Sequence, residues 1–164
     1  MDELDVRLEW LHASKAAYVH ASGENPEETA MTKILDWATS KGLTQKSGPS
    51  LFGRNTYPTE QPKPHGYEYY LTVNGDFAQE GDVEMKALPE GLYAVLRFTN
   101  LFAMHDAWMR LIKWAKDNGH EQVGVGKNEH GWINSGFEEL LNWQEINQKP
   151  PTEWAFDIWL QIKK

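Results

Sequence analysis

Short segments in which apolar and polar residues alternate recur along the chain and predict β-strands. An apolar residue at every second position gives a strand one buried face and one exposed face. The segments with this pattern are Val6–Leu11, Ala16–Ala21, Leu51–Tyr57, Tyr67–Val73, Val83–Leu88, Leu92–Phe98, Gly136–Leu141 and Ala155–Ile162. Three prolines between Tyr57 and Gly66 predict a loop there, because proline cannot donate a hydrogen bond to a neighbouring strand.

Two helices are predicted by apolar residues that recur every three or four positions. Before the first helix, Asn25-Pro26-Glu27-Glu28 supplies an N-cap, a proline for the first turn and a capping-box glutamate. Its apolar face comprises Ala30, Met31, Ile34, Leu35 and Ala38, and that of the second helix comprises Met104, Ala107, Trp108, Leu111 and Ala115. The second helix follows Asn100, and glycines suited to a C-terminal cap end both helices, Gly42 and Gly119.

The chain matches itself when it is shifted by 77 residues, which predicts an internal duplication. In this register Asp5-Val6 matches Asp82-Val83, Trp37-Ala38 matches Trp114-Ala115, and Gly42 matches Gly119. We therefore expect one domain over residues 1–164, made of module 1 (about 5–73), a linker (about 74–81) and module 2 (about 82–162).

The expected fold class is α+β. Two β-α-β-β modules would pair around a pseudo-twofold axis to form an antiparallel sheet with both helices on one face. The opposite face would then be free, and a ligand cleft is expected between the halves.

Aromatic residues are more frequent than a core of this size requires. Trp, Tyr and Phe make up 12% of the 164 residues, and eight residues are Trp. Large rings supply flat contact area at low entropic cost, so the surplus favours a binding surface, although a Trp-rich core accounts for it equally well.

Charge and cysteine content exclude several classes of function. A net charge of −8, with no basic run longer than Lys163-Lys164, argues against binding of nucleic acid by this chain alone. The chain has no cysteine and its six histidines show no metal-ligand spacing, so we expect no metal and no cofactor. The acidic start Met1–Asp5 is no signal peptide and no run reaches membrane-span length, which predicts a cytoplasmic location without membrane attachment.

The two predicted halves differ where Gly53 falls opposite Glu138. One copy lacks a side chain and the other supplies a carboxylate. A carboxylate inside an aromatic cleft needs a partner, and a cationic ligand is one such partner. The alternative is that Glu138 lies solvated at an exposed strand edge.

Tyr70 and Trp159 hold matching positions on the last predicted strand of each half. If the apolar faces of these strands pack on the helices, Tyr70 and Trp159 form the walls of the cleft. Periodicity leaves the opposite assignment open, with Tyr69 facing inward. Trp37 and Trp114, at equal helix positions, are expected in the core.

Five short runs between Gly91 and Leu160 are similar to one known family, in a resemblance that extends in order along essentially the whole chain. They are Gly91–Arg97, Ala107–Leu111, Gly136–Asn142, Pro150-Pro151 and Asp157–Leu160. These runs resemble the gyrase-inhibitor-like (GyrI-like) effector-binding family. The resemblance implies a pair of SHS2 modules that binds lipophilic, often cationic, compounds and that places Glu138 in the ligand pocket. It also implies kinship with the sensing domains of multidrug-responsive transcription activators.

The sequence departs from the family pattern at three positions. The family usually has Tyr where Leu140 stands, Asp where Trp143 stands and Pro where Gln161 stands. Loss of the Tyr removes a hydrogen-bond partner of Glu138, which favours binding over catalysis, and Trp143 adds a ring at the same edge. The candidate ligand-binding residues are Glu138, Tyr70, Trp159, Trp143, Phe102 and Trp108.

Three functions are compatible with these residues. The first is a binding protein that senses or sequesters a lipophilic, cationic or aromatic molecule, with Glu138 as counter-charge. The second, implied by the resemblance, is a hydrolase of reactive cyclopropane-containing natural products in which Glu138 acts as general base. The third is an acidic inhibitor that binds a protein partner such as a topoisomerase. Because the predicted duplication begins by Asp5, we expect a stand-alone member of the family.

Overall fold

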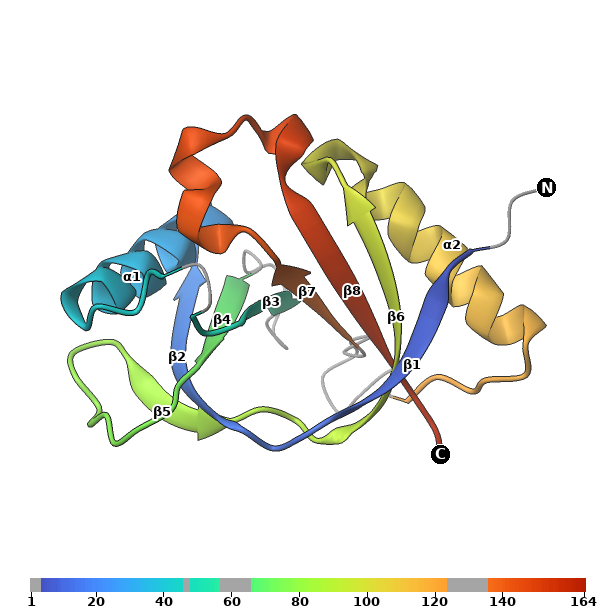
Figure 1. Cartoon of the computed structure of the whole chain (residues 1–164), viewed down its shortest axis with the longest axis horizontal. Helices are drawn as coiled ribbons and strands as arrows, with labels where there is room; N and C mark the ends of the chain where they lie inside the picture. The colour runs from blue at the N-terminus through green and yellow to red at the C-terminus, as the bar shows by residue number, and fades with distance from the viewer. Residues whose placement is uncertain (1–3, 46–47, 57–65, 124–135) are drawn as a thin grey trace.

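The computed structural model describes residues 4–45, 48–56, 66–123 and 136–164 of the chain. Its strands are β1 (Val6–Leu11), β2 (Lys15–Ser22), β3 (Leu51–Thr56), β4 (Gly66–Thr72), β5 (Glu84–Ala87), β6 (Gly91–Thr99), β7 (Gly136–Leu140) and β8 (Ala155–Ile162). They form one eight-stranded sheet in the order β1-β6-β8-β7-β3-β4-β2-β5, and every neighbouring pair is antiparallel (Figure 1). The predicted α+β class is therefore confirmed, while most of the predicted loop 57–66 lies outside the described residues.

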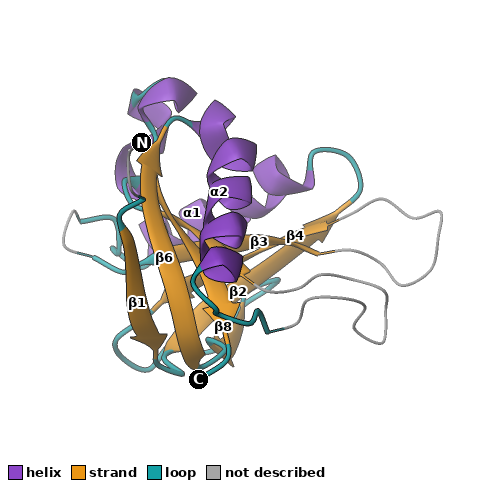
Figure 2. Cartoon of the chain, turned by 90° about the vertical axis from the view of Figure 1, so that its right-hand side faces the viewer, coloured by secondary structure: helices purple, strands orange, loops and turns teal. Residues whose placement is uncertain are grey.

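Both long helices cover the same face of the sheet (Figure 2). Helix α1 (Pro26–Ser40) packs on β2 and β4, and helix α2 (Met104–Asp117) packs on β6 and β8. Short 3-10 turns complete the chain: η1 (Leu101–Ala103) precedes α2, whereas η2 (Trp143–Gln148) and η3 (Pro151–Glu153) connect β7 to β8. In the described part of the chain, no helix has both the length and the apolar content needed to span a membrane.

The helix ends follow the sequence signals only in part. Gly42 (φ 70°) and Gly119 (φ 75°) adopt the left-handed conformation that ends each helix, as predicted. Asn25 precedes α1, but its own φ is 48° and its side chain makes no capping hydrogen bond, so the predicted capping box does not form. The acidic residues Glu27 and Glu28 instead stabilise the first turn through the helix dipole.

The strand order is symmetric about the contact between β3 and β7. Reading outward, one side is β3-β4-β2-β5 and the other is β7-β8-β6-β1. When β1–β4 are matched with β5–β8, the two sides have the same order, as a pseudo-twofold arrangement requires. The outer strands are exchanged between the two sets of four, since β1 pairs with β6 and β5 pairs with β2. The internal duplication and its module boundaries remain predictions.

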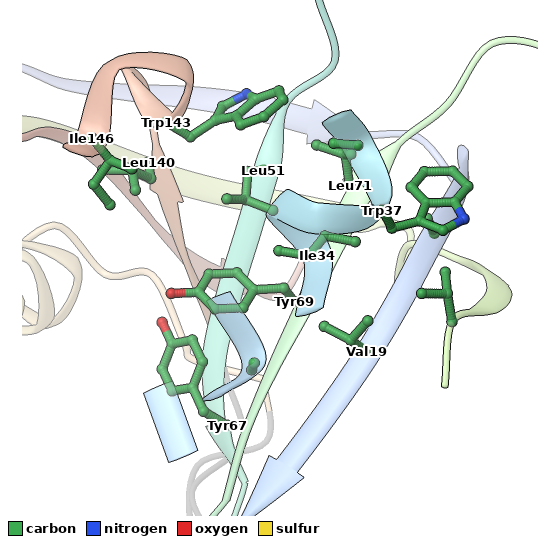
Figure 3. Packing of buried hydrophobic residues seen from close by; sticks show 14 of the residues in the cluster. Val19, Ile34, Trp37, Leu51, Tyr67, Tyr69, Leu71, Leu140, Trp143 and Ile146 are labelled. Carbon is green, nitrogen blue, oxygen red and sulfur yellow. The ribbon is translucent and has the colours of Figure 1, made fainter. Parts of the chain in front are cut away.

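Apolar residues on the helix-covered face form the cores beneath the two helices. Under α1, Ile34 and Trp37 pack with Val19 of β2 and Leu71 of β4 (Figure 3). Under α2, Leu111 packs with residues of β6 and β8. Trp37 is buried in the first cluster, as expected, whereas Trp114 is only partly buried and packs against the second cluster.

The opposite face of the sheet is not free, contrary to the expectation from sequence. Its central strands carry a buried aromatic cluster: Tyr18, Phe52, Tyr70, Tyr93, Phe137 and Trp159, with Leu11, Ala16, Leu88 and Val95. Neighbouring rings meet edge to face, as between Phe52 and Trp159, whose ring centroids lie 5.6 Å apart. The aromatic surplus therefore serves partly as a second core.

Two buried carboxylates lie on this opposite face, and each has a cationic partner. Asp157 accepts hydrogen bonds from Arg97 Nε and Arg7 Nη2, both at 2.9 Å. Glu68 accepts one from Tyr18 Oη at 2.6 Å and pairs with Arg54. Burial alone would raise the pKa of Asp157, but the hydrogen bonds from the two arginines outweigh it and lower the pKa.

Candidate functional site

Glu138 lies near the middle of the sheet, on the face that carries the helices. It stands on β7, directly opposite Gly53 of β3, where the two halves of the sheet meet. Its Oε1 accepts a hydrogen bond from Tyr67 Oη at 2.8 Å, and its Oε2 accepts one from Trp108 Nε1 at 3.0 Å. The donors come from β4 and α2, so the carboxylate is held by both halves of the fold.

The surroundings of Glu138 favour its neutral form. Burial raises its pKa, the hydrogen bonds from Trp108 and Tyr67 lower it, and the negative charge of Glu27 raises it. The net effect is a raised pKa, because the desolvation of the carboxylate is larger than the stabilisation by two neutral donors. A positive charge placed next to Glu138 would instead stabilise the ionised carboxylate and lower its pKa.

Tyr67 and Tyr69 form a pair of buried rings beside Glu138. Their ring centroids are 4.9 Å apart, and the rings are tilted by 56° to each other. Figure 3 shows the two hydroxyl oxygens pointing toward one another. Burial raises the pKa of both phenols, so both remain protonated donors at neutral pH.

A cavity of about 530 Å³ lies beside this pair, between α1 and the connection from β7 to β8. Its described lining consists of Glu27, Glu28, Met31, Thr32, Leu35, Asp36, Tyr69, Ile146, Asn147 and Trp154. Three of these ten residues are acidic and none is basic, while rings and aliphatic side chains supply much of the remaining surface. Tyr69 lines the cavity and also packs against Tyr67, which donates to Glu138.

The predicted site residues do not all lie together. Trp108 contacts Glu138, as described, whereas Tyr70 (6% exposed) and Trp159 (7% exposed) lie on the opposite face of the sheet. There they pack with Phe52 and Phe137, away from the described cavity. The open choice between Tyr69 and Tyr70 is thus decided for Tyr69 as the residue on the Glu138 face.

Trp143 and Phe102 occupy contrasting positions. Trp143 is 2% exposed in the core beneath α1, and its Nε1 donates to the carbonyl of Pro49 at 2.8 Å. Phe102 is 75% exposed on η1, where the side chain of Asn100 (φ 91°) accepts a hydrogen bond from the Phe102 amide. Neither residue contacts Glu138 through a described hydrogen bond, and their role in ligand binding remains a prediction.

Tyr67 and Tyr69 are candidate site residues that sequence reasoning missed. The loss of the family's usual Tyr at Leu140 suggested that Glu138 lacks a hydroxyl partner, but Tyr67 supplies one from the other half of the sheet. Leu140 itself is buried in the core beneath α1. The available signal was Gly53, because a missing side chain opposite Glu138 indicates that another group occupies that space.

Among the described residues, no group of three or more His, Asp or Glu side chains is arranged to hold a metal ion.

The family of the chain follows from its match to a family model. A model of the GyrI-like small molecule binding domain matches residues 4–163, nearly the whole chain. The chain belongs to the GyrI-like family. A comparison of this GyrI-like chain with curated proteins finds no match.

Several solved structures share the fold of this chain. The EcmrR C-terminal domain has a TM-score of 0.67 at 16% identity, with 98% of each chain covered. In an EcmrR–DNA complex, the match covers 57% of the EcmrR chain. A hydrolase encoded by lin2189 from Listeria innocua has a TM-score of 0.60 at 13% identity, covering 96% of this chain and 91% of that one. SAV2435 bound to tetraphenylphosphonium has a TM-score of 0.54 at 14% identity, covering 98% and 94%.

Proposed function

We propose that this GyrI-like chain binds a lipophilic cation and uses Glu138 as its counter-charge. The observation that carries the proposal is a partly buried carboxylate whose hydrogen-bond partners, Tyr67 and Trp108, are both neutral. An ionised carboxylate in such a place is costly, and a bound cation offsets that cost. The two rings that line the neighbouring cavity, Tyr69 and Trp154, would add cation–π attraction of roughly 1–2 kcal/mol each when the site is dry.

The acidic cavity beside Tyr69 supports the same proposal. Its volume of about 530 Å³ lies within the range of small-molecule sites. Its apolar walls suit a lipophilic ligand, and its carboxylates favour a positive charge over a negative one. The ligand would lie against Tyr69 with its charge directed toward Glu138. Such binding would serve either to sense or to sequester the compound.

A calorimetric titration tests this proposal. Burial raises the pKa of Glu138, and a bound cation would lower that pKa again, so that the carboxyl group holds less proton in the complex than in the free protein. Binding of tetraphenylphosphonium, measured in two buffers with different ionisation enthalpies, should therefore show proton release. Triphenylphosphine oxide, a neutral molecule of similar shape, should bind more weakly and release none. Equal affinity for both molecules would contradict the proposal.

Hydrolysis is the second candidate function, and the raised pKa of Glu138 favours it. A general base works best when its pKa lies near the working pH, and Tyr67 would hold the carboxylate in place for attack by water. A cyclopropane-bearing electrophile separates the two functions. If Glu138 is a base, Glu138→Gln should bind this electrophile almost as well as the wild-type protein does but fail to open its ring. If Glu138 is a counter-charge, neither protein should turn it over.

We further propose that this chain alone binds no nucleic acid and functions in the cytoplasm. The net charge of −8 supports the first part of this proposal, because nucleic-acid binding requires a basic surface that displaces counterions. Fluorescence anisotropy with labelled duplex DNA at physiological salt should show no binding. Sequence-specific binding by the purified chain would contradict the first part of this proposal.

A further inference from the structure

Two glycines lie under the rings that donate to Glu138. A Cβ added at Gly53 would lie 2.6 Å from Tyr67 Oη and 2.7 Å from ring carbons of Tyr67 and Tyr69. A Cβ added at Gly136 would lie 2.6 Å from a ring carbon of Trp108 and 2.3 Å from the carbonyl oxygen of Trp159. Real Cβ atoms essentially never approach other atoms this closely, so each ring lies in space that only glycine leaves open.

The strand registers explain why these glycines matter to Glu138. Gly53 pairs with Glu138 across β3 and β7, and it pairs with Tyr69 across β3 and β4. Tyr67 therefore has to cross β3 at Gly53 before its hydroxyl can reach β7. Gly136 lies two residues before Glu138 on the same face of β7, where the ring of Trp108 covers it. Both donors thus reach the carboxylate by passing over a glycine.

We propose that Gly53 is a specificity-determining position. Because Gly53 has no side chain, Tyr67 can reach Glu138 and donate a hydrogen bond to it. This hydrogen bond makes the site select cations over neutral molecules of the same shape. This inference rests on the proposed binding function. The hydrogen bond from Tyr67 stabilises the ionised carboxylate, and only the ionised form attracts a cation. A side chain at Gly53 would displace Tyr67, favour the protonated acid and remove the charge without altering Glu138 itself.

Gly53→Ala is the variant best suited to test this proposal. The close contacts of its added methyl group are ring atoms of side chains, and Gly53 does not have the positive φ that would strain an alanine. At Gly136 the contact with the Trp159 carbonyl is to the backbone of β8, so a substitution there would disturb the sheet. Gly91→Ala is the matched control, because it adds a methyl group to strand β6 next to the flexible end of Gln161.

The experiment measures the pKa of the Glu138 carboxyl by ¹³C NMR and the Kd of tetraphenylphosphonium between pH 5 and 9. The proteins are wild type, Gly53→Ala, Tyr67→Phe, the double variant and Gly91→Ala. We expect Gly53→Ala and Tyr67→Phe each to raise the pKa by about one unit, the effect of one hydrogen bond to a charged group. Affinity for the cation should fall about tenfold below the raised pKa and recover above it. The double variant should match either single variant, and Gly91→Ala should match wild type.

Three results would overturn the role of Gly53. The first is an unchanged Glu138 pKa in Gly53→Ala, and the second is a set of pKa shifts that add in the double variant, because Tyr67 would then not be the intermediary. An equal loss of affinity at every pH would show a steric effect of the methyl group and would also overturn it. If the wild-type protein binds no tetraphenylphosphonium, the proposed function and the cation selectivity both fail, while the titration still decides whether Gly53 positions Tyr67.

Discussion

Glu138 and Glu139 are neighbours on β7, and their carboxylates lie on opposite faces of the sheet. Glu138 accepts hydrogen bonds from Tyr67 and Trp108 on the helix-covered face. Glu139 accepts one from Trp159 Nε1 at 3.0 Å beside the aromatic cluster on the other face. One strand thus carries two largely buried acids in separate surroundings, and each residue serves as a control for the other.

Glu139 should make the stability of the protein depend on pH. Burial raises its pKa to about 7, which the hydrogen bond from Trp159 only partly offsets. An acid whose pKa is higher in the folded state than in the unfolded state contributes stability that is present at low pH and is lost as the pH rises. As the pH rises from about 4.5 to 7, ionisation of Glu139 should therefore lower the free energy of unfolding by roughly 2–3 kcal/mol.

Urea denaturation at pH 5 and pH 8 checks this prediction. Glu139→Gln stays uncharged, so it should lose less stability than the wild-type protein between the two pH values. The same pH dependence in both proteins would show that Glu139 does not titrate in this range.

Loss of the arginines that pair with Asp157 should destabilise the protein more than loss of Asp157 itself. Asp157 is buried, whereas the side chains of Arg7 and Arg97 are 36% and 61% exposed. Removal of both arginines leaves a buried charge without a partner, and such a change costs about 3–5 kcal/mol. Asp157→Asn leaves two arginines that water can hydrate, so it should cost less. Chemical denaturation of Arg7→Ala/Arg97→Ala and of Asp157→Asn at pH 7 would measure the difference, and equal costs would contradict it.

Two buried tryptophans test the value of an indole hydrogen bond. Trp143 donates to the carbonyl of Pro49, whereas the buried Nε1 of Trp37 has no hydrogen-bond partner among the described residues. Replacement by Phe shrinks both side chains alike but leaves an unpaired carbonyl only at Pro49. Trp143→Phe should therefore destabilise the protein by about 1 kcal/mol more than Trp37→Phe, as measured by thermal denaturation. An equal or opposite order would contradict the assigned bond.

The sequence predicted the bounds of the helices and strands better than it predicted which faces of the sheet are buried. Alternation located every described strand to within one residue, and Gly42 and Gly119 marked the helix ends. It could not show that the face opposite the helices is also buried, because strand alternation does not reveal how tightly aromatic side chains cover a face. Residues such as Tyr70 and Trp159 were therefore assigned to a cleft, and the structure places them in a second core.

The sequence identified only some of the residues around Glu138, because it does not reveal which strands are neighbours. Glu138 stood out because Gly53 breaks the match between the halves, and family resemblance supported Glu138 and Trp108. Tyr67 was missed because it lies on β4, two strands away from β7, and the order of strands in a sheet is not encoded in periodicity. The break at Gly53 drew attention to the pairing of β3 with β7, but only the structure shows that Tyr67 lies over this glycine.

The central claim, that Glu138 is the counter-charge for a bound cation, is tested most directly by the affinities of Glu138→Gln. Calorimetry at pH 8 should compare tetraphenylphosphonium with neutral triphenylphosphine oxide for wild type, Glu138→Gln and Glu139→Gln. We predict that Glu138→Gln weakens binding of the cation by roughly 1–3 kcal/mol and leaves the neutral molecule unaffected. Glu139→Gln should bind both molecules as wild type does, because its carboxylate lies on the other face. Undiminished binding of the cation by Glu138→Gln would contradict the account.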